Sequence, residues 1–293
     1  MILNSVARFA DRWIDAADLS LSLTDIGFRQ GVVAVERLRT YHGRLFEISR
    51  HLDRWRQTVD GLQIVGLPGH AEMRDIAIEL CDRNSAVFKR QSDLAMVWLA
   101  TPGTLGGPPT LIMHLGALPL QTIDQRISDG QRLIVTDVVQ PPEASWSRQF
   151  KVRCRLHYYL ADAAAWRRDP DGSGVLVDAD GSVTETSISN LAVVRSGIIF
   201  SPPPDQVLRG VTQAVVEDLA ATARLRWQHQ RIGPDELFGA DEVLLMGTDT
   251  GLWFANGVDV ASADRPTTRK RRGAIYAELR RRFDDAVYTR GLK

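Results

Sequence analysis

Lysine is scarce in this chain, and one lysine lies where its chemistry could be used. Of the 36 basic residues only four are lysines, at positions 89, 151, 270 and 293. A lysine amine can attack a carbonyl and form an imine, whereas a guanidinium, which is always protonated, cannot. Lys89 and Lys270 stand among other cations and Lys293 is the last residue, but Lys151 opens the helix-like stretch KVRCRLHYYLADAAAWRR. Lys151 is the candidate nucleophile, and the plain alternative is a surface cation.

Arg155 follows Lys151 by four residues. In a helix over 151–167, residues at this spacing lie on the same face, so we expect the guanidinium near the amine. A neighbouring cation favours the neutral form of a lysine amine, which is its nucleophilic form.

Two polar segments further along the chain could hold an anion. Residues 184–190 read TETSISN, with Glu185 followed by small hydroxyl and amide side chains that include Ser189 and Asn190. Residues 208–213 read LRGVTQ, where a glycine precedes a predicted helix, and backbone N–H groups at a helix start bind phosphate well. The plain alternative for each segment is a polar turn.

Hydrophobic patterning predicts the elements that must position these residues. A β-hairpin is expected from VVAVERLRTY and RLFEI around His42-Gly43, followed by a helix capped by Ser49 and a second helix near 70–88. Strands are expected at LAMVWLAT, TLIMHLGAL, RLIVTDVV and DEVLLMGT, and in the region GVLVDADGSVTET to NLAVVRSGIIFSPP. Helices are expected at 151–167, at 211–225 and from about residue 268 to the end.

The order of these elements indicates an α+β or α/β protein with two domains. We expect a small N-terminal domain over 1–118, a linker over 119–131 and a C-terminal domain over 132–293.

Composition excludes several classes of protein. The chain has 293 residues, equal numbers of acidic and basic side chains and 44% hydrophobic residues, which is ordinary for a globular protein. Zero formal charge argues against nucleic-acid binding, and the lack of an 18-residue apolar run argues against a membrane span. No histidine pairing of the HxxxH or HExxH type occurs and there are two cysteines, so we expect no metal site, no disulfide framework and a cytoplasmic location.

Taken in order, the segments resemble the class IV aminotransferases, which are the fold-type IV pyridoxal-phosphate (PLP) enzymes. The family includes branched-chain and D-amino-acid aminotransferases and aminodeoxychorismate lyase. The likeness covers nearly the whole chain and is carried by TDIGFRQG with RTYHGRLFEISRHLDRW, by KVRCRLHYYLA, by GVLVDADGSVTETSISNLAVVRSGIIFSPPPDQVLRGVTQ and by ADEVLLMGTDTGLWFANGVD. It implies a smaller N-terminal α/β sandwich, a larger β-barrel-like C-terminal domain with helices, and a homodimer.

The resemblance also implies a role for each candidate residue. Lys151 would form the Schiff base with PLP and then move the proton during the reaction, and Glu185 would pair with the protonated pyridine nitrogen. The phosphate would be bound by Arg54 and by the group Ser189, Asn190, Val211, Thr212 and Thr248, and Arg155 would contact the phenolic oxygen of the ring. Val35, Trp98, Asp249 and Thr250 would line the substrate pocket.

Three departures from the family pattern fall on the substrate side. Gly31–Glu36 reads GVVAVE, so Val35 replaces the usual aromatic residue. Residues 101–103 read TPG and lack the arginine that binds a carboxylate in some relatives, and Asp249-Thr250 replaces the alanine pair of the branched-chain enzymes. The main reading is a branched-chain-like aminotransferase acting on 2-amino and 2-oxo acids. A PLP-dependent lyase of the aminodeoxychorismate type and a catalytically altered PLP-binding homologue remain alternatives.

Overall fold

The computed structural model describes residues 3–261 and 267–292, and its contacts divide the chain into two compact units. The first unit comprises residues 1–119, 149–154 and 287–293, and the second comprises 120–148 and 155–286. The chain therefore returns to the first unit for six residues around Lys151.

The first unit is an antiparallel sheet with helices on one face. Its strand order is β16-β4-β3-β5-β6-β1-β2. The strands are β1 (Val6–Phe9), β2 (Arg12–Asp15), β3 (Ala34–Tyr41), β4 (Arg44–Phe46), β5 (Leu94–Thr101), β6 (Thr110–Ala117) and β16 (Gly291–Leu292). The helices are the 3-10 turn Ala16–Asp18, α1 (Ile26–Gln30), α2 (Ile48–Gly61), α3 (His70–Arg83) and α4 (Ser85–Phe88).

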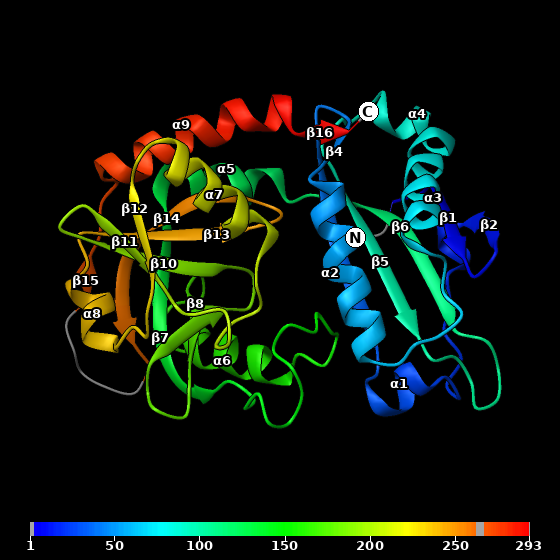
Figure 1. Ribbon diagram of the computed structural model, residues 1–293, viewed down its shortest axis with the longest axis horizontal. Helices are drawn as coiled ribbons and strands as arrows, with labels where there is room; N and C mark the ends of the chain where they lie inside the picture. Colours follow the sequence, from blue (N-terminus) through cyan, green and yellow to red (C-terminus); the bar gives the residue numbers. More distant parts are fainter. Residues whose placement is uncertain (1–2, 262–266, 293) are drawn as a thin grey trace. The chain divides into compact units, whose positions relative to one another are not determined.

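Alternation along the strands builds the core of this unit. Leu38, Met96 and Met113 share one buried cluster with Leu52 of α2 and Leu80 of α3, so they point to the face that these helices cover. The strands and helices of this unit are labelled in Figure 1. The hairpin β3–β4 and the strands β5 and β6 confirm the sequence prediction. The predicted cap at Ser49 is wrong, because α2 begins at Ile48 after Glu47, whose φ of 52° is left-handed and whose side chain makes no capping bond.

The second unit is built around a closed barrel of six strands in the order β10-β13-β14-β7-β8-β9, and β9 pairs back onto β10. The barrel strands are β7 (Gln131–Val139), β8 (Ser173–Val177), β9 (Val183–Thr186), β10 (Asn190–Arg195), β13 (Glu242–Gly247) and β14 (Gly251–Val260). The strands β11 (Ile198–Ser201), β12 (Arg226–His229) and β15 (Thr268–Arg269) extend it. The helices are α5 (Leu120–Asp129), α6 (Leu156–Trp166), α7 (Val211–Thr222), α8 (Pro234–Gly239) and α9 (Ala274–Thr289).

Every second residue of the barrel strands fills the barrel. Leu133 and Val135, Leu191 and Val193, and Leu245 belong to one buried cluster. A sandwich-like first unit and a barrel with helices are the fold that the resemblance implies, and this expectation is confirmed. Of the described helices, none is both long enough and apolar enough to cross a membrane.

Candidate active site

Lys151 lies in an extended segment and not in a helix. Val152 forms an isolated β-bridge with Ala34, and α6 begins only at Leu156. The prediction of a helix over 151–167 is therefore wrong at its N-terminal end, and Lys151 and Arg155 are not one helical turn apart. The apolar and aromatic residues 156–166 carry the helical pattern, whereas the preceding residues pair with a strand.

Two elements of the first unit fix the backbone of Lys151. Its carbonyl accepts the Val35 N–H of β3 at 2.9 Å, and its own N–H donates to the Thr58 hydroxyl of α2 at 3.1 Å. The Thr58 hydroxyl in turn donates to the Arg54 carbonyl at 3.0 Å. Three of the residues chosen from sequence, Val35, Arg54 and Lys151, are thus held by the same pair of elements.

The Arg54 side chain is oriented by a buried carboxylate. Glu36 of β3 is 0% exposed and accepts from Arg54 through both oxygens, at 2.9 Å from Nε and 2.7 Å from Nη2. It also contacts His51 Nδ1 at 2.9 Å. Burial alone would raise the pKa of Glu36, but Arg54 and His51 together bring it well below its ordinary value. The guanidinium is therefore held in one plane by a permanently charged partner.

The same buried cluster keeps His51 neutral. Burial lowers its pKa, Glu36 raises it, and the charges of Arg54 and Lys151 lower it further, so the net shift is downward. Neutral His51 then donates one ring N–H to Glu36. His51 and Arg54, which belong to one sequence motif, therefore both bind the Glu36 carboxylate.

In the second unit, Glu185 and Asn190 close the barrel. They are the residue pair through which β9 meets β10. One Glu185 oxygen accepts from the Tyr158 hydroxyl at 2.6 Å, from Gln140 Nε2 at 3.3 Å and from the Leu208 N–H at 3.4 Å. The other accepts from Asn190 Nδ2 at 3.0 Å. Both carboxylate oxygens thus accept hydrogen bonds, and the four donors that surround them suit a negative charge at this position.

The start of α7 lies against this acid. The Asn190 amide also donates to the Leu208 carbonyl at 2.8 Å, and Gly210 is the N-cap of the helix without a side-chain cap. The first main-chain bond of the helix runs from the Ala214 N–H to the Gly210 carbonyl, so the preceding N–H groups, including those of Val211 and Thr212, have no partner within the helix. A helix start with open N–H groups beside hydroxyl side chains suits an anion such as phosphate.

Two turns lie side by side at this end of the barrel. In the first, Thr186 and Ser189 join their hydroxyls at 2.8 Å. In the second, Thr248–Thr250 links β13 to β14, and a Cβ on the preceding Gly247 would lie 2.3 Å from the Ile188 carbonyl, so the two backbones touch. The buried Thr250 hydroxyl has no hydrogen-bond partner within the described part of the chain.

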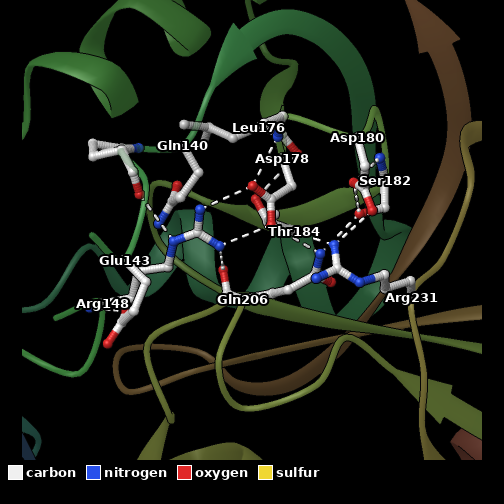
Figure 2. Close-up of polar contacts among 12 residues, drawn as sticks. Gln140, Glu143, Arg148, Leu176, Asp178, Asp180, Ser182, Thr184, Gln206 and Arg231 are labelled. Atoms are coloured by element: carbon white, nitrogen blue, oxygen red, sulfur yellow. Dashed lines mark hydrogen bonds and ion pairs between the residues drawn. The ribbon is translucent and has the colours of Figure 1, made fainter. Parts of the chain in front are cut away.

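A buried ion pair holds the loops that lead into these segments (Figure 2). Arg148, three residues before Lys151, donates to both oxygens of Asp178 at 2.9 Å, and Gln206 donates to Asp178 and to Ser182 at 2.9 Å each. The Arg148 hydrogen bond holds the pKa of Asp178 well below its ordinary value. The network ties the β8–β9 hairpin, the loop after β7 and the loop before α7 to one another.

A half-buried arginine lies at the same end of the barrel. Arg126 of α5 lines a cavity of about 770 Å³ together with Asp162, Ser187 and Ile188. Burial lowers the pKa of Arg126, and the nearby charges of Asp249 and Asp162 partly offset that shift. The acid in the Thr248–Thr250 turn therefore has a cation in its surroundings.

One residue chosen for the substrate pocket belongs to the core instead. Trp98 is 0% exposed and meets Trp55 edge to face at 5.9 Å between ring centroids. Its place on β5 points it toward the helices, because strand residues alternate between faces. The prediction that Trp98 lines the pocket is wrong.

Four residues that contact or surround the candidate site residues were not selected from the sequence, namely Glu36, Gln140, Tyr158 and Arg126. Tyr158 lies three residues after Arg155, in a motif in which the cations are the residues with an obvious chemical role. Gln140 is far in sequence from the acid that it contacts, and no local pattern indicates it. Glu36 ends the GVVAVE motif and could have been found there.

Comparisons with known proteins identify the family of this chain. Residues 34–257 match the family described as amino-transferase class IV. The chain is 28% identical over 290 residues to a putative branched-chain-amino-acid aminotransferase of Methanocaldococcus jannaschii, with 96% of each chain covered. It is 26% identical over 257 residues to aminodeoxychorismate lyase of Bacillus subtilis, covering 84% of this chain and 81% of the relative.

Among solved structures, branched-chain aminotransferase from Thermoproteus uzoniensis, determined with norvaline, superposes with a TM-score of 0.84 at 17% identity and covers 98% of this chain and 95% of its own. The fold is therefore the fold of that enzyme. Because the family match spans most of the chain, this protein belongs to the class IV aminotransferases, which are PLP-dependent transaminases.

Proposed function

We propose that the protein transfers the amino group of a 2-amino acid to a 2-oxo acid, with branched-chain amino acids as the preferred class, and that Lys151 carries the cofactor. The observation that carries this proposal is the Glu185 carboxylate, which four donors surround at the end of the barrel. A carboxylate of this kind stabilises a proton on a pyridine nitrogen.

The residues present fit PLP. Its phosphate needs N–H and hydroxyl donors, which Val211, Thr212, Ser189 and Thr248 of the second unit offer. The absence of a Cβ at Gly210 matters here, because a Cβ would lie 2.0 Å from Asn190 Oδ1 and displace the amide that contacts Glu185. Bound PLP supplies an electron-withdrawing ring that stabilises negative charge next to the amino group.

The residues of this chain would then act as follows. Lys151, with its backbone fixed on β3 and α2, would move the proton between the substrate carbon and the cofactor carbon, a task that requires an amine. Glu36 would keep Arg54 in the orientation that binds phosphate. Arg155, whose guanidinium donates to the Ser187 carbonyl, would contact the ring oxygen.

On the substrate side we propose Val35, Asp249 and Thr250. Val35 precedes Glu36 on β3 and bonds to the Lys151 backbone, and its small apolar side chain suits an aliphatic substrate. The unpartnered Thr250 hydroxyl suits a carboxylate oxygen. Arg126 would compensate the charge of Asp249, which would otherwise repel a substrate carboxylate.

A panel of amino donors tests the function. We expect nitrogen transfer from leucine, isoleucine or valine to 2-oxoglutarate, loss of that transfer in Lys151→Ala, and retention in the matched control Lys89→Ala, which changes an exposed lysine. Pyruvate release from aminodeoxychorismate without an amino acceptor would support the lyase alternative, for which the relative from Bacillus subtilis is the supporting observation. Absence of both activities in protein loaded with PLP would favour the altered homologue.

We further propose a homodimer and a cytoplasmic location. Helix α6 exposes Leu156, Tyr159 and Leu160, which share one face of the helix at spacings of three and four residues, and such a patch favours a protein partner. Sedimentation at micromolar concentration would show a dimer that Leu160→Glu weakens. Cys81 and Cys154 are both free thiols, the state that a reducing compartment maintains.

A further inference from the structure

The hydroxyl of Tyr158 makes the shortest contact to Glu185. The two oxygens are 2.6 Å apart, against 3.0 to 3.4 Å for the other three donors. Burial raises the pKa of Tyr158 well above its ordinary value, and the Glu185 charge raises it further. The phenol therefore stays protonated and donates a hydrogen bond to the carboxylate.

The phenol is itself held from α6. The guanidinium carbon of Arg155 lies 4.2 Å from the centre of the Tyr158 ring, and its Nη2 donates to the Ser187 carbonyl in the turn after β9. The His157 ring packs on Tyr158 at 4.1 Å between centroids. Tyr158 is thus fixed relative to the C-terminal end of β9, the strand that carries Glu185.

We propose that Tyr158 is a positioning residue for the cofactor: its hydroxyl keeps the Glu185 carboxylate ionised, so that the acid can hold the proton on the PLP ring nitrogen. This inference rests on the proposed role of Glu185. Gln140, Asn190 and the Leu208 N–H hold the carboxylate in place without Tyr158, so the main effect of the phenol is on charge and less on position.

The elements that pack around Glu185 differ in the groups that they bring to it. Helix α6 contributes Tyr158, Arg155 and His157, and the pKa of His157 falls to about 4 through burial and the Arg155 charge, so His157 does not titrate between pH 6 and 8. Gln140 after β7, Asn190 at the start of β10 and the Leu208 N–H before α7 contribute neutral donors, and the Arg209 side chain beside Leu208 is exposed.

The experiment compares the binding of PLP with that of an analogue whose ring nitrogen is replaced by carbon. Dissociation constants are measured on the apoprotein by fluorescence quenching between pH 6 and 8. The wild-type protein should prefer PLP by about tenfold or more across this range, as expected for a hydrogen bond between charged groups. The phenol donates to the charged form of the acid and so favours it, and Tyr158→Phe removes that donor. The variant should therefore lose most of the preference at pH 6 and recover it as the pH rises.

The matched control is Tyr288→Phe, which removes the same oxygen from an exposed tyrosine in α9. It should keep the wild-type preference at every pH. Replacement of Tyr158 by a difluorotyrosine, which keeps the packing and strengthens the donor, should preserve the preference at pH 6 even if Tyr158→Phe proves too unstable to measure.

Two results would overturn the inference. If Tyr158→Phe folds and has the same preference as the wild type at all pH values, the phenol only packs against the acid. If the wild-type protein shows no preference between the two ligands, Glu185 does not serve the ring nitrogen, and the proposed function fails with the inference.

Discussion

Gly210→Ala isolates the contact on which the geometry of the acid depends. The backbone at Gly210 has φ −72° and ψ 135°, which alanine adopts without strain, so the effect of the substitution is steric. The new Cβ would lie 2.0 Å from Asn190 Oδ1, so the amide would have to move by more than about 1 Å to restore normal contact.

That movement costs the two hydrogen bonds of the Asn190 amide, at 3.0 Å to Glu185 and 2.8 Å to the Leu208 carbonyl. A bond to a charged group contributes about 1.5–3 kcal/mol and a neutral bond about 1 kcal/mol, so we expect a loss of roughly 2–4 kcal/mol. This free energy is divided between the stability of the second unit and its affinity for PLP. If all of it were lost from the affinity, PLP binding would weaken by about 30- to 1000-fold.

The assay pairs urea unfolding of the apoprotein with PLP titration. Gly69→Ala and Gly233→Ala are matched controls, because both glycines are helix N-caps with similar φ and a Cβ there meets no atom closer than 3.7 Å. Any general cost of alanine at an N-cap appears in all three variants. If Gly210→Ala matched the two controls in both measurements, the reasoning about Asn190 and Glu185 would be refuted.

Two other predictions follow from the buried titratable groups. Glu36→Gln should lower the free energy of unfolding by about 3–5 kcal/mol, because it leaves the buried Arg54 charge without its partner, whereas the exposed-pair control Glu79→Gln should cost less than about 1 kcal/mol. Folding lowers the pKa of Glu36, so its contribution to the free energy of unfolding is present above the unfolded pKa of about 4.5 and is lost progressively as the pH falls below that value. The urea unfolding midpoints of the wild type and Glu36→Gln should therefore converge in acid. Burial, with the charge of an adjacent aspartate, raises the pKa of the Cys81 thiol to about 12, so iodoacetamide at pH 8 should label exposed Cys154 and spare Cys81, as read by peptide mass; equal labelling of both would contradict the burial of Cys81.

Local patterns predicted the parts of the fold that local physics determines. Apolar runs identified β5 and β6, and the turn sequence at Asp178–Gly181 identified the β8–β9 hairpin. A glycine before an apolar run located the start of α7 at Val211. The helix prediction failed at Lys151 because the next residue, Val152, pairs with Ala34, which lies more than one hundred residues earlier in the chain. This pairing overrides the helical pattern that follows. The sequence prediction also missed α5, which lies in the segment expected to be a linker. Only Ile123 of this helix is buried, so its hydrophobic pattern is weak.

The site was predictable where a motif carries it and unpredictable where contacts are distant. Glu185 and Asn190 are five residues apart in one motif, and the structure joins them directly. The Gln140 contact to the same acid spans 45 residues, and no single sequence shows such a pairing. Trp98 was misplaced because sequence gives the alternation of a strand but not which of its faces the helices cover.

The central claim is that Lys151, and no other lysine, carries the cofactor. Borohydride reduction of the protein loaded with PLP, followed by peptide mapping, tests it most directly. We predict the pyridoxyl label on the peptide that contains Lys151, with Lys89 and Lys270 unmodified. A label on either of those lysines, or no label on a protein that has bound PLP, would contradict the account.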